Sequence, residues 1–238
     1  MAAYFVTGTD TDAGKTLITA GLLALARRRG LTTLGLKPVA SGSEPVTLED
    51  GTSALRNADA LALQAQSHPP EPYVVVNPHA FAPAIAPHLA ARRAGTTVSL
   101  DTLVPQVRQG LSHHRDLTLV EGAGGWRVPL NDREDLAELA VHLALPVILV
   151  VGLRLGCISH ARLTAEAIAA SGLRLSGWAG SLVDPAFAAD SALHDDNLAI
   201  LARALDAPCL GILPRLPDGD PRAMAAAAAA YLELPDVD

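Results

Sequence analysis

The sequence contains few residues of the kinds that carry disulfide, metal or covalent chemistry. Its two cysteines, Cys157 and Cys209, are isolated in a chain of 238 residues and have no metal-binding spacing. Its eight histidines form no metal signature, and no Ser-His-Asp or Cys-His arrangement can be argued from their positions. We therefore expect reduced thiols in a cytoplasmic protein.

Long apolar runs and long basic runs are also missing. The longest apolar run, residues 143–153, is too short to span a membrane and contains Pro146 and Gly152. No signal peptide is expected, because a strand beginning at Ala3 leads directly into a glycine-rich loop. The net charge is −7, and no basic run exceeds Arg27-Arg28-Arg29. These features argue against a membrane or a nucleic acid as partner.

Short aliphatic runs alternate with longer amphipathic segments along the chain. Several short runs are continuously apolar, as are strands buried on both faces of a parallel sheet. The expected strands are residues 3–6, 32–37, 117–121, 147–151, 175–183 and 209–213. The expected helices are residues 15–28, 57–66, 99–111, 136–143, 159–171, 190–205 and 221–232. This pattern predicts one α/β domain over residues 1–238, with a doubly wound, mostly parallel sheet flanked by helices. Ligands are expected at the carboxyl ends of its strands.

The most informative segment joins the first expected strand to the first expected helix. Residues 6–16 read VTGTDTDAGKT, a glycine-rich loop that ends in Gly-Lys-Thr. Backbone N–H groups and a helix N-terminus attract phosphate, while Lys15 can reach a terminal phosphate and Thr16 can ligate Mg²⁺. Five residues separate Gly8 from Gly14, where the usual pattern has four. The flanking strand and helix still predict a P-loop NTPase; the alternative is a glycine-rich turn with a surface lysine.

Three charged residues lie at the ends of apolar segments or helices. Lys37 ends the second expected strand, where it either faces the crevice beside the P-loop or is a solvated strand end. Glu121 ends the third and precedes a glycine-rich stretch, which favours a Mg²⁺ ligand over a helix-capping or surface carboxylate. Asp59 follows Asn57 at a helix start, where a cap and a favourable first-turn acid are the simplest interpretation.

Residues 43–87 are the least regular part of the sequence. They contain prolines at positions 45, 69, 70, 72, 78, 83 and 87. We expect this part of the chain to form loops and short helices over the site, since proline ends helices and strands. Ser41 and Gly42, which precede it, could supply hydroxyl and backbone donors there.

Taken together, these segments resemble dethiobiotin synthetase, a P-loop family of the biotin pathway. The matching segments follow the family's order across most of the chain, and the family shares the shifted glycine of the loop. They are residues 6–16, 37–42 (KPVASG), 56–61 (RNADAL), 76–78 with 86–88, 120–126 (VEGAGGW) and 155–160 (LGCISH). The resemblance implies a homodimer with shared active sites.

The resemblance also implies ATP-dependent closure of a cyclic urea from 7,8-diaminononanoate and CO₂, a ligase reaction that forms C–N bonds. One amine forms a carbamate, and the carbamate takes the γ-phosphoryl group of ATP. The second amine then attacks this mixed anhydride and releases phosphate. Because carbamate and triphosphate are both anions, Lys15, Lys37, Mg²⁺ and the helix N-terminus would offset their repulsion.

The roles of individual residues follow from the same resemblance. Lys15 and Thr11 would contact phosphate and the carbamate region, and Lys37 would stabilise the carbamate. The Mg²⁺ ligands would be Thr16, Asp59 and Glu121, which gives Asp59 a second role beside its helix. The substrate contacts would be Ser41, Gly156, Cys157 and Ser159. The nucleotide contacts would be Asp12, Ala13, Gly14, Lys15, Thr16, Leu17, Asp59, Glu121, Gly122, Ala123, Gly124, Ser181, Pro214, Arg215 and Leu216.

Three residues depart from the family pattern. Asp12 stands where a longer Glu is common, which shortens its reach toward a ligand. Ser159 stands where Asn is frequent, in a segment implied to bind substrate across the dimer interface. Ser181 stands where an Asn is expected to read adenine.

Two other classes of P-loop protein are alternatives to this interpretation. An amide-forming ligase, such as a cobyrinic acid diamide synthase, would need a glutamine-hydrolysing domain with a catalytic Cys, and the chain has no room for one. A switch ATPase of the chromosome-partitioning or division-site type would act by binding partners. Such proteins carry an additional Lys early in the P-loop, where Thr9 or Asp10 stands here, and often a membrane-binding tail.

Overall fold

The computed structural model describes residues 1–217 and 219–236, and its centre is a six-stranded parallel sheet. The strand order is β10-β9-β8-β1-β7-β2, and every neighbouring pair runs parallel. The strands are β1 (Ala2–Gly8), β2 (Thr33–Leu36), β7 (Leu117–Glu121), β8 (Val147–Leu153), β9 (Leu175–Leu182) and β10 (Cys209–Leu213). The expected doubly wound, parallel sheet is therefore confirmed.

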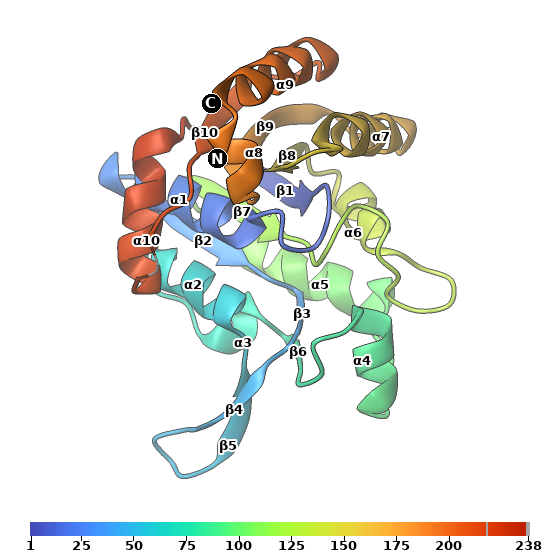
Figure 1. The fold of residues 1–238 in the computed structure, drawn as a ribbon. Coiled ribbons are helices and arrows are strands. Elements are labelled where there is room, and N and C mark those ends of the chain that lie inside the picture. The colour runs from blue at the N-terminus through green and yellow to red at the C-terminus, as the bar shows by residue number, and fades with distance from the viewer. Residues whose placement is uncertain (218, 237–238) are drawn as a thin grey trace.

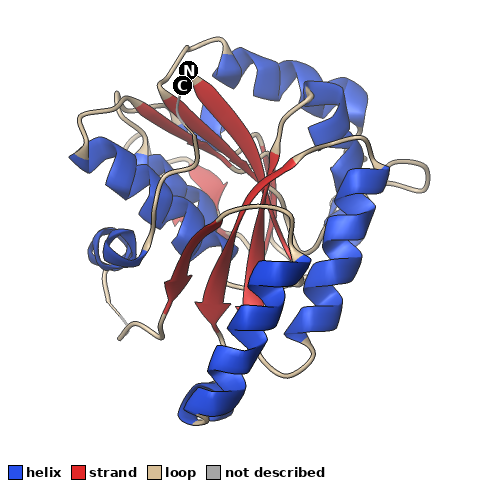
Figure 2. Ribbon diagram, turned by 90° about the horizontal axis from the view of Figure 1, so that it is seen from above, coloured by secondary structure: helices blue, strands red, loops and turns tan. Residues whose placement is uncertain are grey.

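Helices cover both faces of this sheet, as Figures 1 and 2 show. One face carries α1 (Lys15–Arg28), α2 (Ala58–Gln66) and α10 (Pro221–Ala228), which is followed by the 3₁₀ turn η1 (Ala229–Tyr231). The other carries α5 (Leu100–Leu111), α6 (Leu136–Leu143) and α7 (Cys157–Ala170). Against α7 pack α9 (Ser191–Ala204) and, beside it, α8 (Pro185–Ala189). No helix of the described residues is both long and apolar enough to cross a membrane.

The strands are apolar on both faces because each face has its own core. In β1, Tyr4 and Val6 pack into the cluster beneath α1 and α10, whereas Phe5 packs into the cluster beneath α5 and α6. Successive side chains of a strand point to opposite faces, so a doubly covered strand must be apolar throughout. This buried strand ends at Gly8, where the P-loop begins.

The expectation of loops and short helices for residues 43–87 is incomplete. Beside α2, α3 (Tyr73–Val76) and α4 (Pro87–Arg93), the region contains β4 (Glu44–Thr47) and β5 (Ser53–Arg56). They form an antiparallel hairpin that projects from the body in Figure 1. A short parallel pair, β3 (Val39–Ser41) with β6 (His79–Phe81), connects the region to the sheet edge. The sequence signal for this hairpin was the pair Asp50-Gly51, because Asp-Gly between β-prone residues favours a hairpin turn. In the structure Gly51 lies in the turn with φ +81°.

Candidate functional site

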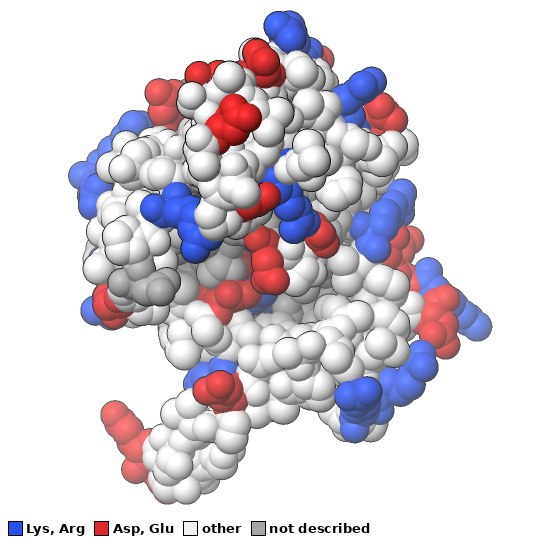
Figure 3. Space-filling model, in the orientation of Figure 1, with Lys and Arg blue, Asp and Glu red and all other residues white. Residues whose placement is uncertain are grey.

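A cavity of about 1010 Å³ lies at the carboxyl ends of the central strands. Its walls come from the P-loop, the segments after β2 and β7, the start of α2 and the loop before α4. Figure 3 shows the corresponding face hollowed near its centre, with acidic side chains at the edge of the hollow. The expected site residues that line the cavity are Thr11, Asp12, Gly14, Lys15, Thr16, Leu17, Lys37, Ser41, Asp59, Ala123 and Gly124.

Lys37 lies between two carboxylates at this cavity, so it is not a solvated strand end. Its ammonium is 2.6 Å from Glu121 Oε1 and 3.2 Å from Asp59 Oδ2, and it donates to the Gly122 carbonyl at 3.1 Å. Glu121 is fully buried and Lys37 is only 4 % exposed. Burial alone would lower the pKa of Lys37, but the attraction of Glu121 and Asp59 outweighs it and raises the pKa. Lys37 is therefore held charged.

Asp59 reaches the same cluster from the first turn of α2. Asn57 accepts the Ala60 N–H and so caps this helix, which leaves the Asp59 carboxylate free to pair with Lys37. Burial opposes ionisation of Asp59, yet the nearby Lys37 charge lowers the pKa of the carboxyl. The two interpretations of this segment are thus compatible, because different residues supply the cap and the charge at the site.

Lys15 is a second buried cation at the cavity, with different surroundings. It is 7 % exposed, and its ammonium donates to the Asp10 carbonyl at 3.0 Å. No carboxylate of the described residues forms an ion pair with it. Burial and the nearby Lys37 charge lower its pKa, although Glu121 and Asp59 act in the opposite direction. Such a cation is best satisfied by an incoming anion, and phosphate is the ligand that a P-loop lysine binds.

The oxygen atoms around Glu121 fit the ligands of a magnesium ion. Thr16 Oγ1 lies 2.8 Å from Glu121 Oε1, and Glu121 Oε2 is buried with no hydrogen-bond partner among the described residues. A buried carboxylate oxygen without a partner is costly, and a cation would satisfy it. No group of three or more His, Cys, Asp or Glu able to hold a metal occurs in the part of the chain that the structure describes. Two carboxylates and one hydroxyl suit Mg²⁺, which takes its other ligands from phosphate and water.

The P-loop takes a conformation that few residues adopt. Asp12 has φ +56° and Gly14 has φ +85°, both in the left-handed region. A Cβ at position 14 would lie 2.3 Å from Ser181 Oγ, so only glycine fits there without a shift. Ser181, at the end of β9, is thereby brought against the P-loop, although it does not line the large cavity.

The other expected substrate and nucleotide residues lie outside the large cavity of this chain. Pro214, Arg215 and Leu216 follow β10, while Gly156, Cys157 and Ser159 are at the start of α7. Cys157 is buried, its N–H donates to the Arg154 carbonyl, and burial raises the pKa of its thiol. The loop before α7 is tied to the P-loop, because Arg154 forms an ion pair with Asp10 at 2.6 Å.

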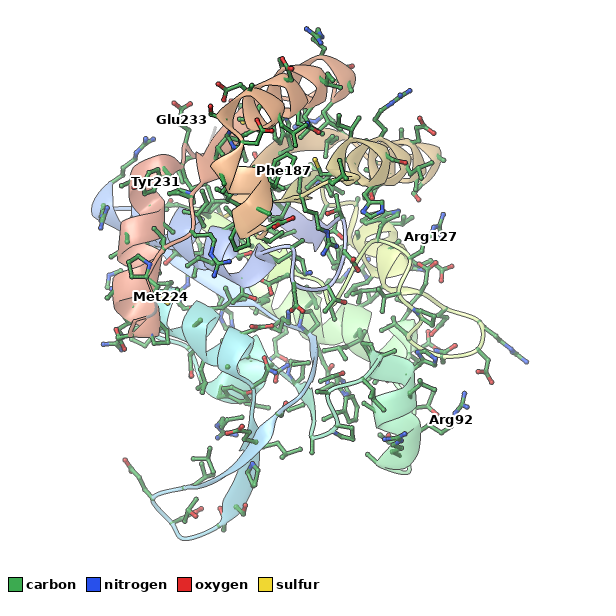
Figure 4. All side chains as sticks on the ribbon, in the orientation of Figure 1. Arg92, Arg127, Phe187, Met224, Tyr231 and Glu233 are labelled. Carbon is green, nitrogen blue, oxygen red and sulfur yellow. The ribbon has the colours of Figure 1, made fainter. Side chains whose placement is uncertain are left out.

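Residues to which the sequence assigned no role at the site also line the cavity. Ala84 to Pro87 and Arg127 to Pro129 form parts of its wall. Arg127 pairs with Asp135, the cap of α6, at 3.0 Å and lies beside that helix in Figure 4. The available signal was that the first stretch overlaps the matching segment Ala86-Pro87-His88 and the second follows the glycines after Glu121.

Solved structures show the same fold at low sequence identity. The MinC:MinD cell division protein complex of Aquifex aeolicus matches with a TM-score of 0.57 at 14 % identity, covering 96 % of this chain and 86 % of that one. The MinD cell division protein of the same organism matches with a TM-score of 0.54 at 15 % identity, covering 96 % and 87 %. These likenesses extend to the fold alone.

Sequence relatives are far closer. A family described as "AAA domain" matches residues 2–223. The ATP-dependent dethiobiotin synthetase BioD of Chromohalobacter salexigens is 67 % identical over 239 residues, covering 99 % of both chains. The enzyme of the same name from Pseudomonas aeruginosa is 58 % identical, covering 98 % of this chain and 97 % of its own. Together with the P-loop and Lys37 in one cavity and the buried Glu121 paired with Lys37, this identity over nearly the full length shows that the chain belongs to the dethiobiotin synthetase family.

Proposed function

We propose that this protein closes the ureido ring of dethiobiotin from 7,8-diaminononanoate and CO₂ at the expense of ATP. The observation that carries the proposal is the presence of two buried lysines, Lys15 and Lys37, in the cavity of a P-loop family member. One cation suits the terminal phosphate, and the other suits an anionic acceptor beside it. A partner-binding switch ATPase is not favoured, because its likeness to this chain is that of the fold.

The reaction needs anions to be held together rather than a covalent intermediate on the enzyme. An amine nitrogen bonds to CO₂ and loses a proton, which gives a carbamate. A carbamate oxygen bonds to the γ-phosphorus of ATP as the bond to ADP breaks. The second amine then bonds to the carbamate carbon and loses a proton as phosphate leaves, and the ring is closed. Because each step needs close alignment of two reactants, positioning and charge stabilisation supply most of the rate.

The roles that we propose follow the surroundings of each residue. Lys15 exchanges the Asp10 carbonyl for the γ-phosphate, while Lys37 and Thr11 contact the carbamate. Ser41 Oγ is buried without a hydrogen-bond partner among the described residues, so it is available to the substrate.

We propose that Thr16, Asp59 and Glu121 hold Mg²⁺, which neutralises phosphate charge when bound. The remaining nucleotide contacts are those expected from the sequence, including Leu17 and residues 214–216. We also propose that the protein acts in the cytoplasm and that residues 1–238 form one domain.

Mass spectrometry tests this function directly. The purified protein is incubated with diaminononanoate, ¹³C-bicarbonate and MgATP, and we expect labelled dethiobiotin together with an equal amount of phosphate. ATP turnover without labelled product, or turnover that depends on DNA or liposomes, would contradict the proposed reaction.

The base preference of the nucleotide site gives a first prediction. Serine lacks the amide that pairs bidentately with adenine, and such a pair contributes roughly 1–3 kcal/mol of discrimination when it reads DNA. Ser181→Asn is therefore expected to raise the kcat/KM ratio of ATP over CTP and GTP by about 10–100-fold. Ser181→Ala is the matched control and should leave the ratio as in the wild type. An unchanged ratio in Ser181→Asn would mean that backbone near residues 214–216 already reads the base.

The assembly gives a second prediction. Gly156, Cys157 and Ser159 lie outside the large cavity of their own chain, and the N-terminus of α7 suits a carboxylate. We propose that this segment receives the substrate carboxylate from the neighbouring subunit of a homodimer. Light scattering should give about twice the 24.6 kDa chain mass. Full activity from a monomer would overturn the shared site.

Subunit mixing separates a shared site from a dimer without one. Lys37→Gln removes the carbamate cation, and Ser159→Asp places a negative charge where the carboxylate would bind. If sites are shared, a mixed dimer contains one site with both defects and one intact site, so equal mixing restores about a quarter of the wild-type activity. No recovery after dissociation and reassociation would contradict the prediction.

A further inference from the structure

A series of hydrogen bonds beside the cavity joins Asn57, which also caps α2, to Tyr73 and Asn77. Asn57 N–H donates to Tyr73 Oη at 2.8 Å, and Tyr73 Oη donates to Asn77 Oδ1 at 2.8 Å. Asn77 Nδ2 then donates to the Lys37 carbonyl at 2.5 Å and to the His79 carbonyl at 3.3 Å. Asn57 and Asn77 are 5 % and 3 % exposed, so water competes little with these bonds.

At its other end, this series of hydrogen bonds reaches two further site residues. Asn57 Nδ2 donates to the Ser41 carbonyl at 3.0 Å, and its Oδ1 accepts the Ala60 N–H at 3.3 Å. The second bond caps α2, the helix whose first turn carries Asp59. Asn57 therefore contacts the backbone at Ser41 and caps the first turn of α2, which carries Asp59. Through Tyr73 and Asn77 it is also linked to Lys37.

Tyr73 can serve as the centre of this series because its hydroxyl acts in both directions. The hydroxyl donates to Asn77 Oδ1 while it accepts the Asn57 N–H, as a protonated tyrosine can, and burial raises the pKa of Tyr73 further. The Arg56 guanidinium lies 4.2 Å from the centre of the Tyr73 ring, which holds the ring from its other side.

We propose that Asn57, Tyr73 and Asn77 are positioning residues, which hold Lys37, Ser41 and Asp59 in register with one another. These three site residues lie on separate segments: Lys37 after β2, Ser41 at the end of β3 and Asp59 in α2. Lys37 must stay within ion-pair distance of Asp59 and Glu121, and a misplacement of about 1 Å costs roughly 10² in rate. The inference rests on the proposed function.

Tyr73→Phe tests the centre of this series of hydrogen bonds, because it removes the hydroxyl oxygen and keeps the ring beside Arg56. Its matched control is Thr33→Val on β2, the strand that Lys37 follows. This change removes a buried hydrogen bond of 2.6 Å from Thr33 Oγ1 to the Gln66 carbonyl. Both variants should lower the Tm by similar amounts. We expect only Tyr73→Phe to lower kcat, by about 10–100-fold, as losses of supporting residues do in metal sites. An equal kcat for the two variants would overturn the inference.

Asn57→Ser tests the Ser41 end and does not depend on the folding of Tyr73→Phe. Serine caps helices about as well as asparagine, so the Tm should fall no further than it does in Thr33→Val, which also loses one buried hydrogen bond. The donor to the Ser41 carbonyl is lost, and we expect the KM for diaminononanoate to rise several-fold while ATP-analogue binding is kept. Unchanged steady-state constants would contradict the positioning role. A wild type that makes no dethiobiotin would remove the proposed function and this inference together, whereas an active wild type isolates the inference.

Discussion

Lys37→Gln is expected to lower kcat for ring closure by about 10²–10³, the loss typical of removing one donor that stabilises developing charge. The same variant should still bind a non-hydrolysable ATP analogue with Mg²⁺, because Lys37 is assigned to the carbamate. Its binding is expected to equal or exceed that of the wild type, since Lys37 no longer competes for Glu121 and Asp59. Calorimetric titration measures this affinity. Loss of nucleotide binding in a folded Lys37→Gln protein would mean that its role is wrongly assigned.

The same substitution has a consequence for stability. Glu121 is fully buried, and Lys37 is its cationic partner in the described part of the chain. Removing one member of a buried ion pair costs about 3–5 kcal/mol, because the other charge is left uncompensated. Lys37→Gln should therefore unfold at a lower Tm without divalent cation and recover part of the difference when Mg²⁺ is added. The absence of any recovery would contradict the assignment of Glu121 as a metal ligand.

The sequence predicts the position of each charge along the chain better than it predicts their contacts. Lys37 and Glu121 each end an apolar run, and parallel strands place such residues at one edge of a sheet. That they form a pair depends on β2 lying next to β7, an order that no local pattern specifies. The approach of Ser181 to Gly14 likewise depends on β8 lying between β9 and β1.

Two regions show where local signals were insufficient. The prolines of residues 43–87 indicated irregular structure, but β4, which contains Pro45, pairs with β5 in a hairpin whose turn holds Asp50-Gly51. At α2 the pattern correctly indicated a helix cap by Asn57, yet it could not show that the same amide also bonds to Ser41. Contacts of this kind join segments far apart in sequence, so they follow from packing and not from local preference.

Lys15→Gln is expected to weaken both nucleotide binding and turnover, in contrast to Lys37→Gln. The ammonium is assigned to the γ-phosphate, and a hydrogen bond to a charged group contributes about 1.5–3 kcal/mol, which corresponds to roughly 10–100-fold in affinity. Because the same contact strengthens as charge develops during transfer, kcat should fall by about 10²–10³. Titration with the ATP analogue and steady-state kinetics measure the two effects separately.

The stability of Lys15→Gln without nucleotide distinguishes the two lysines further. Lys15 is buried, forms no ion pair with a described carboxylate, and has its pKa lowered by burial and by Lys37, so its charge is a cost to the folded protein. Replacing it removes this cost, and the Tm without ligand should equal or exceed that of the wild type. Lys15→Met, which has no polar group to place, serves as the matched control and should behave alike. A marked fall in Tm for both variants would show that Lys15 stabilises the empty site, and unchanged affinity for the ATP analogue would exclude it as the phosphate ligand.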